Sequence, residues 1–166
     1  MSTVESIRHE NPPNIQLRKA EAGDAEFFYG LYRDTRRDEV AAWGWSSEQE
    51  EIFFRMQFRG LQHAYQSQAD IADDQVITAD QAPIGRLIVL RTPKEIRLAD
   101  ISLAPQWRGR GIGGTLIEKL FAESNETGKA VTLHVQKDNP AARLYTRLGF
   151  VVTEDTGAVL TMERRP

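Results

Sequence analysis

A glycine-rich turn between two apolar segments constrains the fold of this chain more than any other feature. The sequence from Ala99 to Leu120 reads ADISLAPQWRGRGIGGTLIEKL, with four glycines between Arg108 and Gly114. Glycine lets the backbone approach a ligand closely, and the first turn of a helix has N–H groups without intrahelical partners. Because the helix dipole adds partial positive charge at that end, the stretch predicts a phosphate-binding site, with pyrophosphate as the expected group.

Apolar residues after the turn recur at helical spacing, which predicts that a helix begins at once. These residues are Ile112, Leu116, Ile117, Leu120 and Phe121. Arg108 and Arg110 add two full positive charges to the turn. The glycines alone do not name the ligand, because Gly109, Gly111 and Gly114 also match the G-x-G-x-x-G fingerprint of dinucleotide-binding domains.

The rest of the chain predicts two helices followed by a sheet. Apolar residues follow helical or alternating spacing in successive segments. The expected elements are a strand over 15–19, helices over 25–40 and 47–67, strands over 73–78, 83–91 and 95–103, the helix after the glycine turn, a strand over 131–136, a helix from 140 to 148, and strands over 150–155 and 158–163. Short turns join the three middle strands and imply antiparallel pairing, whereas the strand, helix and strand from 95 to 136 form a right-handed parallel crossover.

We therefore expect an α/β fold with a mixed, mostly antiparallel twisted sheet and one parallel β-α-β crossover. Ligand is expected near the carboxyl ends of the two parallel strands. The chain has 166 residues, enough for one domain over residues 15–166 after a flexible N-terminal arm over residues 1–14.

Composition excludes several classes of function. The chain has no cysteine, so disulfides, thiolate metal sites and a cysteine nucleophile are excluded. A net charge of −3 argues against a nucleic-acid partner held by bulk positive charge. No apolar run is long enough to cross a bilayer and the N-terminus is polar, so we expect a cytoplasmic protein without a membrane partner. His9, His63 and His134 lack metal-ligand spacing, and no metal is expected.

A second motif, NPAARLYTRLGF, runs from Asn139 to Phe150. It begins about 30 residues after the glycine turn, the usual length of a crossover unit. It is similar to the pattern N-x-x-A-x-x-x-Y-x-x-x-G-F, while Arg108, Gly111 and Gly113 fit (Q/R)-x-x-G-x-(G/A). In this order the two motifs resemble those of the GCN5-related N-acetyltransferase (GNAT) superfamily. The resemblance extends over roughly residues 15–164, but only the second half of the chain contains residues that match the motifs of the superfamily.

The resemblance implies transfer of an acetyl group from acetyl-CoA to an amine of a small molecule or peptide, by direct attack in a ternary complex. The pyrophosphate would be held by the glycine turn and the pantetheine arm by the strand before it. The implied cofactor-binding residues are Ile101, Ser102, Leu103, Arg108, Gly109, Arg110, Gly111, Ile112, Gly113, Gly114, Thr115, Asn139 and Tyr145.

The resemblance also implies that Tyr145 protonates the departing thiolate. An amine attacks only when it is neutral, so a base must remove its proton. Glu95 and Asp100, on the strand before the glycine turn, are the candidate bases, and Glu39 is a further candidate from the helical half.

The two strand acids are expected on opposite faces. Strict alternation along a strand puts Asp100 with Leu98 and Ser102, and Glu95 with Arg97. On this basis only one of the two carboxylates faces a given side of the sheet.

Two alternatives to the enzyme are open. A non-catalytic module that binds acyl-CoA as a sensor would use the same turn without a base. A dinucleotide-binding domain would use Asp138 as its ribose-binding acid, although antiparallel strands precede the turn. Members of the GNAT superfamily often dimerise, so a homodimer is also considered.

Overall fold

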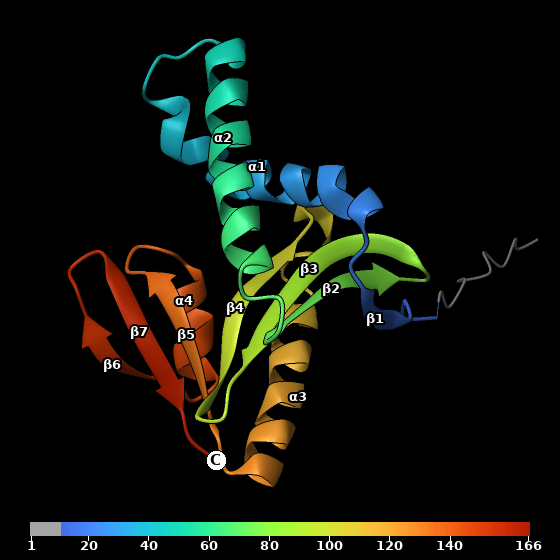
Figure 1. The fold of residues 1–166 in the computed structure, drawn as a ribbon, viewed down its shortest axis with the longest axis vertical. Helices are drawn as coiled ribbons and strands as arrows, with labels where there is room; N and C mark the ends of the chain where they lie inside the picture. The colour runs from blue at the N-terminus through green and yellow to red at the C-terminus, as the bar shows by residue number, and fades with distance from the viewer. Residues whose placement is uncertain (1–10) are drawn as a thin grey trace, which may run out of the picture.

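The computed structural model describes residues 11–166, which form one seven-stranded sheet covered by helices on both faces (Figure 1). The strands are β1 (Ile15–Lys19), β2 (Ala72–Ala79), β3 (Ala82–Arg91), β4 (Glu95–Leu103), β5 (Ala130–Gln136), β6 (Val151–Asp155) and β7 (Val159–Arg164). The helices are α1 (Ala25–Ala41), α2 (Ser47–Gln66), α3 (Ile112–Thr127) and α4 (Ala141–Arg147). The predicted arm falls largely on residues 1–10, which lie outside the described residues, so its boundary stays a prediction.

The sheet has the order β1-β2-β3-β4-β5-β7-β6, and every neighbouring pair is antiparallel except β4 and β5. Helix α3 connects these two parallel strands. The predicted fold class and element order are therefore confirmed. Within residues 11–166, no helix combines the length and apolarity that a bilayer crossing requires.

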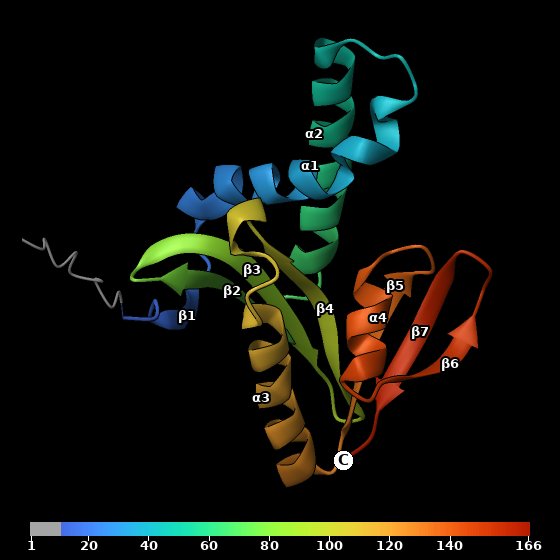
Figure 2. The ribbon, with the colours of Figure 1, turned by 180° about the vertical axis from the view of Figure 1, so that it is seen from behind.

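Two hydrophobic clusters lie on opposite faces of the sheet. Helices α3 and α4 pack on one face, where Ile117 and Leu133 are fully buried (Figure 2). Helices α1 and α2 cover the other face, where Phe54 and Phe58 pack with Val76 of β2. Burial of each such side chain stabilises the fold by about 1.5–3 kcal/mol, which explains why the helical periodicity predicted these elements.

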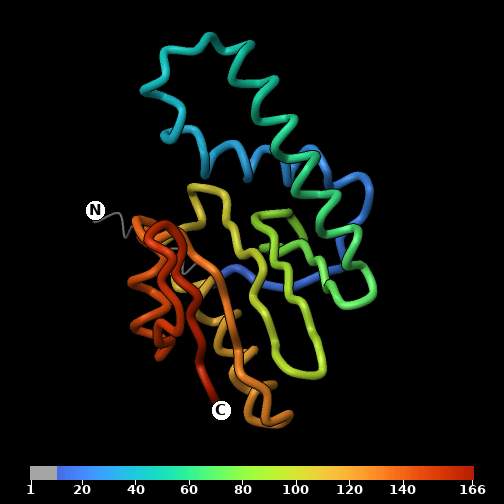
Figure 3. The backbone as a smooth tube through the Cα atoms, turned by 60° about the vertical axis from the view of Figure 1, so that its left-hand side comes forward, coloured from blue at the N-terminus to red at the C-terminus, as the bar shows by residue number. Residues whose placement is uncertain are grey.

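Helix α2 begins with a capping box. Ser46 Oγ accepts a hydrogen bond from Gln49 N (3.2 Å), and Ser46 N donates to Gln49 Oε1 (2.9 Å). The α1–α2 connection stands clear of the sheet (Figure 3). Its exposed Trp43 and Trp45 pack edge-on against each other and against Phe53.

Candidate active site

The two parallel strands separate before they end. Pairing of β4 with β5 runs from Glu95 and Ala130 to Leu98 and Leu133, and no later residues of these strands pair with each other. The remaining part of β4 is still paired with β3 on its other side. Among residues 11–166, the β5-facing backbone edge of residues 99–103 therefore has no strand partner. We call the region beyond Leu98 and Leu133 the fork, and Figure 1 shows the two strands diverging there.

A β-bulge at Ala99 corrects the predicted side-chain alternation. Ile88 of β3 pairs with Asp100 and Val89 pairs with Leu98, so Ala99 has no partner. An extra residue reverses the alternation that follows it. Beyond the bulge, Ile101 packs into the core on the α3 face together with Leu98.

Asp100 consequently lies on the α1/α2 face, opposite to Leu98, which contradicts the expected face. Ser102 still shares its side, and Ser102 Oγ donates a hydrogen bond to Asp100 Oδ2 (3.0 Å). Burial raises the pKa of the Asp100 carboxyl above its usual range, while the bond from Ser102 and the charge of Arg86 offset part of the rise. A carboxyl with a raised pKa binds a proton more tightly, as a general base requires.

Tyr145 packs on the opposite face of the sheet, in the cluster that contains Leu98 and Leu133. It lies on α4, is 9% exposed and packs edge-on against Phe150, with the ring centroids 5.8 Å apart. Burial raises the pKa of Tyr145 to about 12, and the negative charge of Asp100 adds to the rise. The hydroxyl therefore stays protonated at neutral pH.

Glu95 is held at the other end of β4. Its carboxylate pairs with Arg97 (2.6 Å) and accepts a hydrogen bond from Thr132 Oγ1 (2.8 Å). It shares a face with Asp100 because of the bulge, but five residues of strand separate them by about 15 Å. Glu39 lies on α1, where its exposed side chain pairs with Arg36 (3.4 Å).

The glycine turn adopts the conformation that its sequence requires. Gly109 and Gly111 have φ values of +70° and +79°, in the left-handed region that favours glycine. Gly111 is the N-cap of α3, and added Cβ atoms at Gly109, Gly111 and Gly114 would meet nothing within 4 Å. The space beside these three glycines is therefore open, and a ligand can approach the backbone of the turn there.

The polar side chains of the turn make local contacts. Arg108 Nε donates to Leu103 O (2.9 Å), and the Arg110 guanidinium lies over the Trp107 ring at 4.8 Å. Thr115 Oγ1 donates to Gly111 O (3.0 Å). Ile112 anchors the first turn of α3 in the core. These contacts fix the turn beside the end of β4 and leave further donors on both arginines.

Asn139 acts locally as a helix-capping residue. Its Oδ1 accepts a hydrogen bond from Ala141 N (2.9 Å) at the start of α4. Because only the oxygen is used, its amide N–H groups are still available to a ligand. Among residues 11–166, no three acidic or histidine side chains gather as a metal-ligand set.

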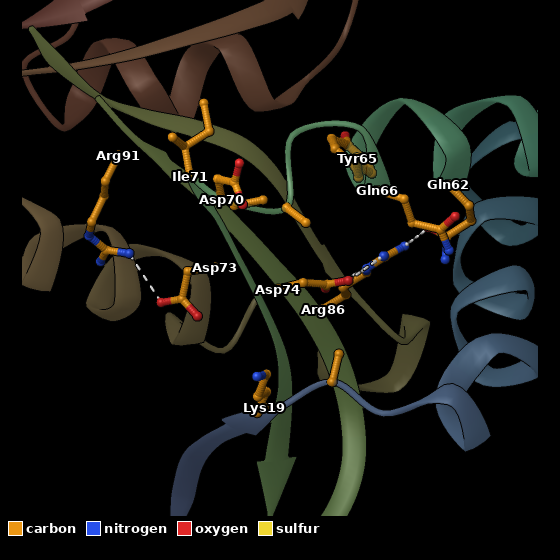
Figure 4. Close-up of a pocket in the computed structure, with 13 residues that line it drawn as sticks. Lys19, Gln62, Tyr65, Gln66, Asp70, Ile71, Asp73, Asp74, Arg86 and Arg91 are labelled. Atoms are coloured by element: carbon orange, nitrogen blue, oxygen red, sulfur yellow. Dashed lines mark hydrogen bonds and ion pairs between the residues drawn. The ribbon is translucent and has the colours of Figure 1, made fainter. Parts of the chain in front are cut away.

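A pocket under α2 contains polar residues that the sequence alone did not indicate. It has a volume of about 660 Å³ and lies between α2 and the sheet (Figure 4). Arg86 of β3, 4% exposed, donates to Asp74 (2.7 and 2.9 Å) and to Gln62 (2.7 Å) at its edge. Tyr65 of α2 also lines it. The sequence signals were Arg86, a charged residue between apolar residues of β3, and the acids Asp73 and Asp74 at the start of β2.

Comparison with known proteins agrees with the geometry. Residues 72–152 match the family model of the acetyltransferase (GNAT) domain. A segment of 57 residues is 42% identical to mycothiol acetyltransferase of Corynebacterium aurimucosum, and it covers 33% of this chain and 19% of that protein. The match thus spans about a fifth of the length of this curated relative.

The fold is shared with solved acetyltransferases. The PaiA N-acetyltransferase of Thermoplasma acidophilum, solved in complex with coenzyme A, is 23% identical with a TM-score of 0.71, covering 92% of this chain and 99% of that one. A GCN5-related N-acetyltransferase from Rhodopseudomonas palustris is 20% identical with a TM-score of 0.65, covering 95% and 99%. At these identities the likeness concerns the fold.

Proposed function

This chain belongs to the GNAT acetyltransferase family through its residues 72–152, and we propose that it transfers an acetyl group from acetyl-CoA to a primary amine of a small molecule or peptide. The observation that carries the proposal is the fork between β4 and β5. It lies beside the glycine turn, with Asp100 on one face of the sheet and Tyr145 on the other.

The residues around the glycine turn fit the phosphates of coenzyme A. The first-turn N–H groups of α3 and the open backbone of Gly109 to Gly114 suit a pyrophosphate, with Arg108, Arg110 and Thr115 beside them. The unpaired edge of Ile101 to Leu103 suits the amide groups of a pantetheine arm, which would add to β4 like a strand. Asn139 offers its amide to the same arm.

The chemistry follows from two groups with opposite tasks. Acetyl-CoA, when bound, supplies the acetyl group as a thioester. Asp100 accepts the proton that the amine must lose, directly or through a water molecule. Tyr145 Oη holds a proton at neutral pH and donates it to the departing thiolate. The chain has no cysteine that could carry the acetyl group, which supports direct transfer to the amine.

The proposal is tested by acetyl transfer to a panel of primary amines, followed by mass spectrometry. Tyr145→Phe and Asp100→Asn should each lower kcat by roughly 100-fold, the usual scale for a lost general acid or base. Tyr32→Phe is the matched control, because it removes a hydroxyl from an α1 tyrosine that packs on Phe54 and Phe58.

Other outcomes identify other assignments. If Glu95→Gln abolishes transfer while Asp100→Asn does not, the base is Glu95. If calorimetry detects coenzyme A binding but no amine is acetylated, the protein is a non-catalytic acyl-CoA module. Absence of coenzyme A binding would refute the proposal altogether.

A further inference from the structure

Three polar side chains form a row across the sheet beneath α2. The register pairs Arg86 with Ser102 and Ile88 with Asp100, and it pairs Asp74 with Ile88. Asp74, Arg86 and Asp100 therefore share one face on three adjacent strands. The row leads from the pocket under α2 to the fork.

Arg86, the buried cation of this row, already has hydrogen-bond partners within the protein. Arg86 donates three hydrogen bonds, two to Asp74 and one to Gln62, and its guanidinium lies 4.0 Å from the Phe28 ring centroid. Asp100, by contrast, forms no ion pair with any residue of 11–166, and its side chain bonds to the neutral Ser102. A desolvated carboxylate without a cation partner favours a cationic ligand.

Tyr65 lies above the same row on α2. Its ring centroid is 5.8 Å from the Arg86 guanidinium carbon, and it lines the pocket. Burial raises the pKa of Tyr65 to about 12, so the hydroxyl stays neutral. Arg86, beside the Tyr65 ring, pairs in register with Ser102, two residues from Asp100, so Tyr65 lies over the same face of the sheet as Asp100. A neutral hydroxyl can accept a hydrogen bond from an ammonium group.

The charges that line the pocket balance. Three acids and three bases line it, and Figure 4 labels them. The acids are Asp70, Asp73 and Asp74, and the bases are Lys19, Arg86 and Arg91. Asp74 pairs with Arg86 (2.7 Å), and Asp73 pairs with Arg91 (3.1 Å), which also pairs with Glu123 of α3 outside the pocket (2.7 Å). Among the lining residues this leaves Lys19 and Asp70, one charge of each sign. The pocket therefore suits a molecule that carries both charges or none, and it does not suit a polycation.

We propose that Tyr65 is an acceptor-binding residue: its hydroxyl and the Asp100 carboxylate hold the incoming ammonium group on the α2 face, and the rest of the acceptor, a polar body without net charge, occupies the pocket under α2. The inference rests on the proposed acetyl transfer.

The test is steady-state kinetics of Tyr65→Phe beside wild type and the Tyr32→Phe control. Loss of one hydrogen bond should raise KM for the amine roughly threefold to tenfold, while KM for acetyl-CoA and the Kd for coenzyme A stay unchanged. Gln66→Ala, at the exposed edge of the pocket, gives a second variant with little risk to folding and should raise only the amine KM. The acceptor class is tested in wild type with L-lysine, whose side-chain amine is attached to a zwitterion, against spermidine, and L-lysine should have the higher kcat/KM.

Each contrary result is decisive. An unchanged amine KM in Tyr65→Phe and Gln66→Ala overturns the acceptor site while acetyl transfer stands. A higher kcat/KM for spermidine overturns the assignment of an acceptor body without net charge. Failure of wild type to acetylate any amine refutes the proposed function, and this inference with it.

Discussion

Gly85→Ala should push β3 away from β4 beside the fork. Gly85 pairs with Leu103, and a Cβ added to it would clash with the backbone oxygen of Ser102 and lie 2.8 Å from Leu103 Cδ2. It would also lie 3.1 Å from Ile77 Cδ1. Two of these neighbours are side chains that can shift, but the backbone oxygen moves only with its strand. Overpacking of this kind costs about 1–3 kcal/mol.

This cost is small enough for the protein to stay folded, since domains are stable by about 5–15 kcal/mol. A chain of this size loses roughly 2–4 °C of Tm per kcal/mol, so a loss of about 2 kcal/mol lowers Tm by roughly 4–8 °C. Affinity for coenzyme A should fall as well, because the displaced residues form the edge offered to the pantetheine arm.

Thermal unfolding followed by circular dichroism measures the change in Tm, and calorimetry measures coenzyme A binding. Gly60→Ala is the matched control. Gly60 lies within α2, where an added Cβ meets nothing within 4 Å, so alanine should stabilise the helix by about 0.8–1 kcal/mol. A Gly85→Ala protein with the Tm of wild type would falsify the argument that β3 and β4 approach too closely for a methyl group.

Two further predictions concern the turn and the tyrosines. Gly111→Ala forces a side chain into the left-handed region at φ +79°, so it should weaken coenzyme A binding by calorimetry more than Gly114→Ala, whose backbone does not require glycine. Burial raises the pKa of Tyr29, Tyr65 and Tyr145 to about 12 from an ordinary value of 10, so the folded state binds their protons more tightly than the unfolded state. The resulting stability is complete below pH 10 and is lost as pH rises toward 12. Urea titrations at pH 9, 10 and 11 can measure this loss. An increase in stability over this range would contradict the burial of these hydroxyls.

Local sequence patterns were sufficient for the elements and their order. The glycines between Arg108 and Gly114 indicated a turn whose backbone can approach a ligand, and apolar periodicity indicated the helix that follows it. These signals involve only a few neighbouring residues, so they can be interpreted without knowledge of the fold. The candidate residues of the turn also came from such signals, because their backbone conformation depends on glycine itself.

The placement of the acids was decided by the tertiary structure. The alternation of β4 predicts Asp100 beside Leu98, but the bulge at Ala99 turns Asp100 to the α2 face. A bulge depends on how two strands pair, and pairing joins residues that are distant in sequence. The surroundings of Arg86 and Tyr65 likewise required β2, β3 and α2 to meet.

The sequence alone therefore determined where the chain forms helices, strands and the glycine turn, because backbone preferences and apolar periodicity are local. Only the tertiary structure decided which carboxylate faces the fork and which residues line the pocket under α2. The physical reason is that strand register, bulges and burial arise from contacts between segments, and no single segment encodes them.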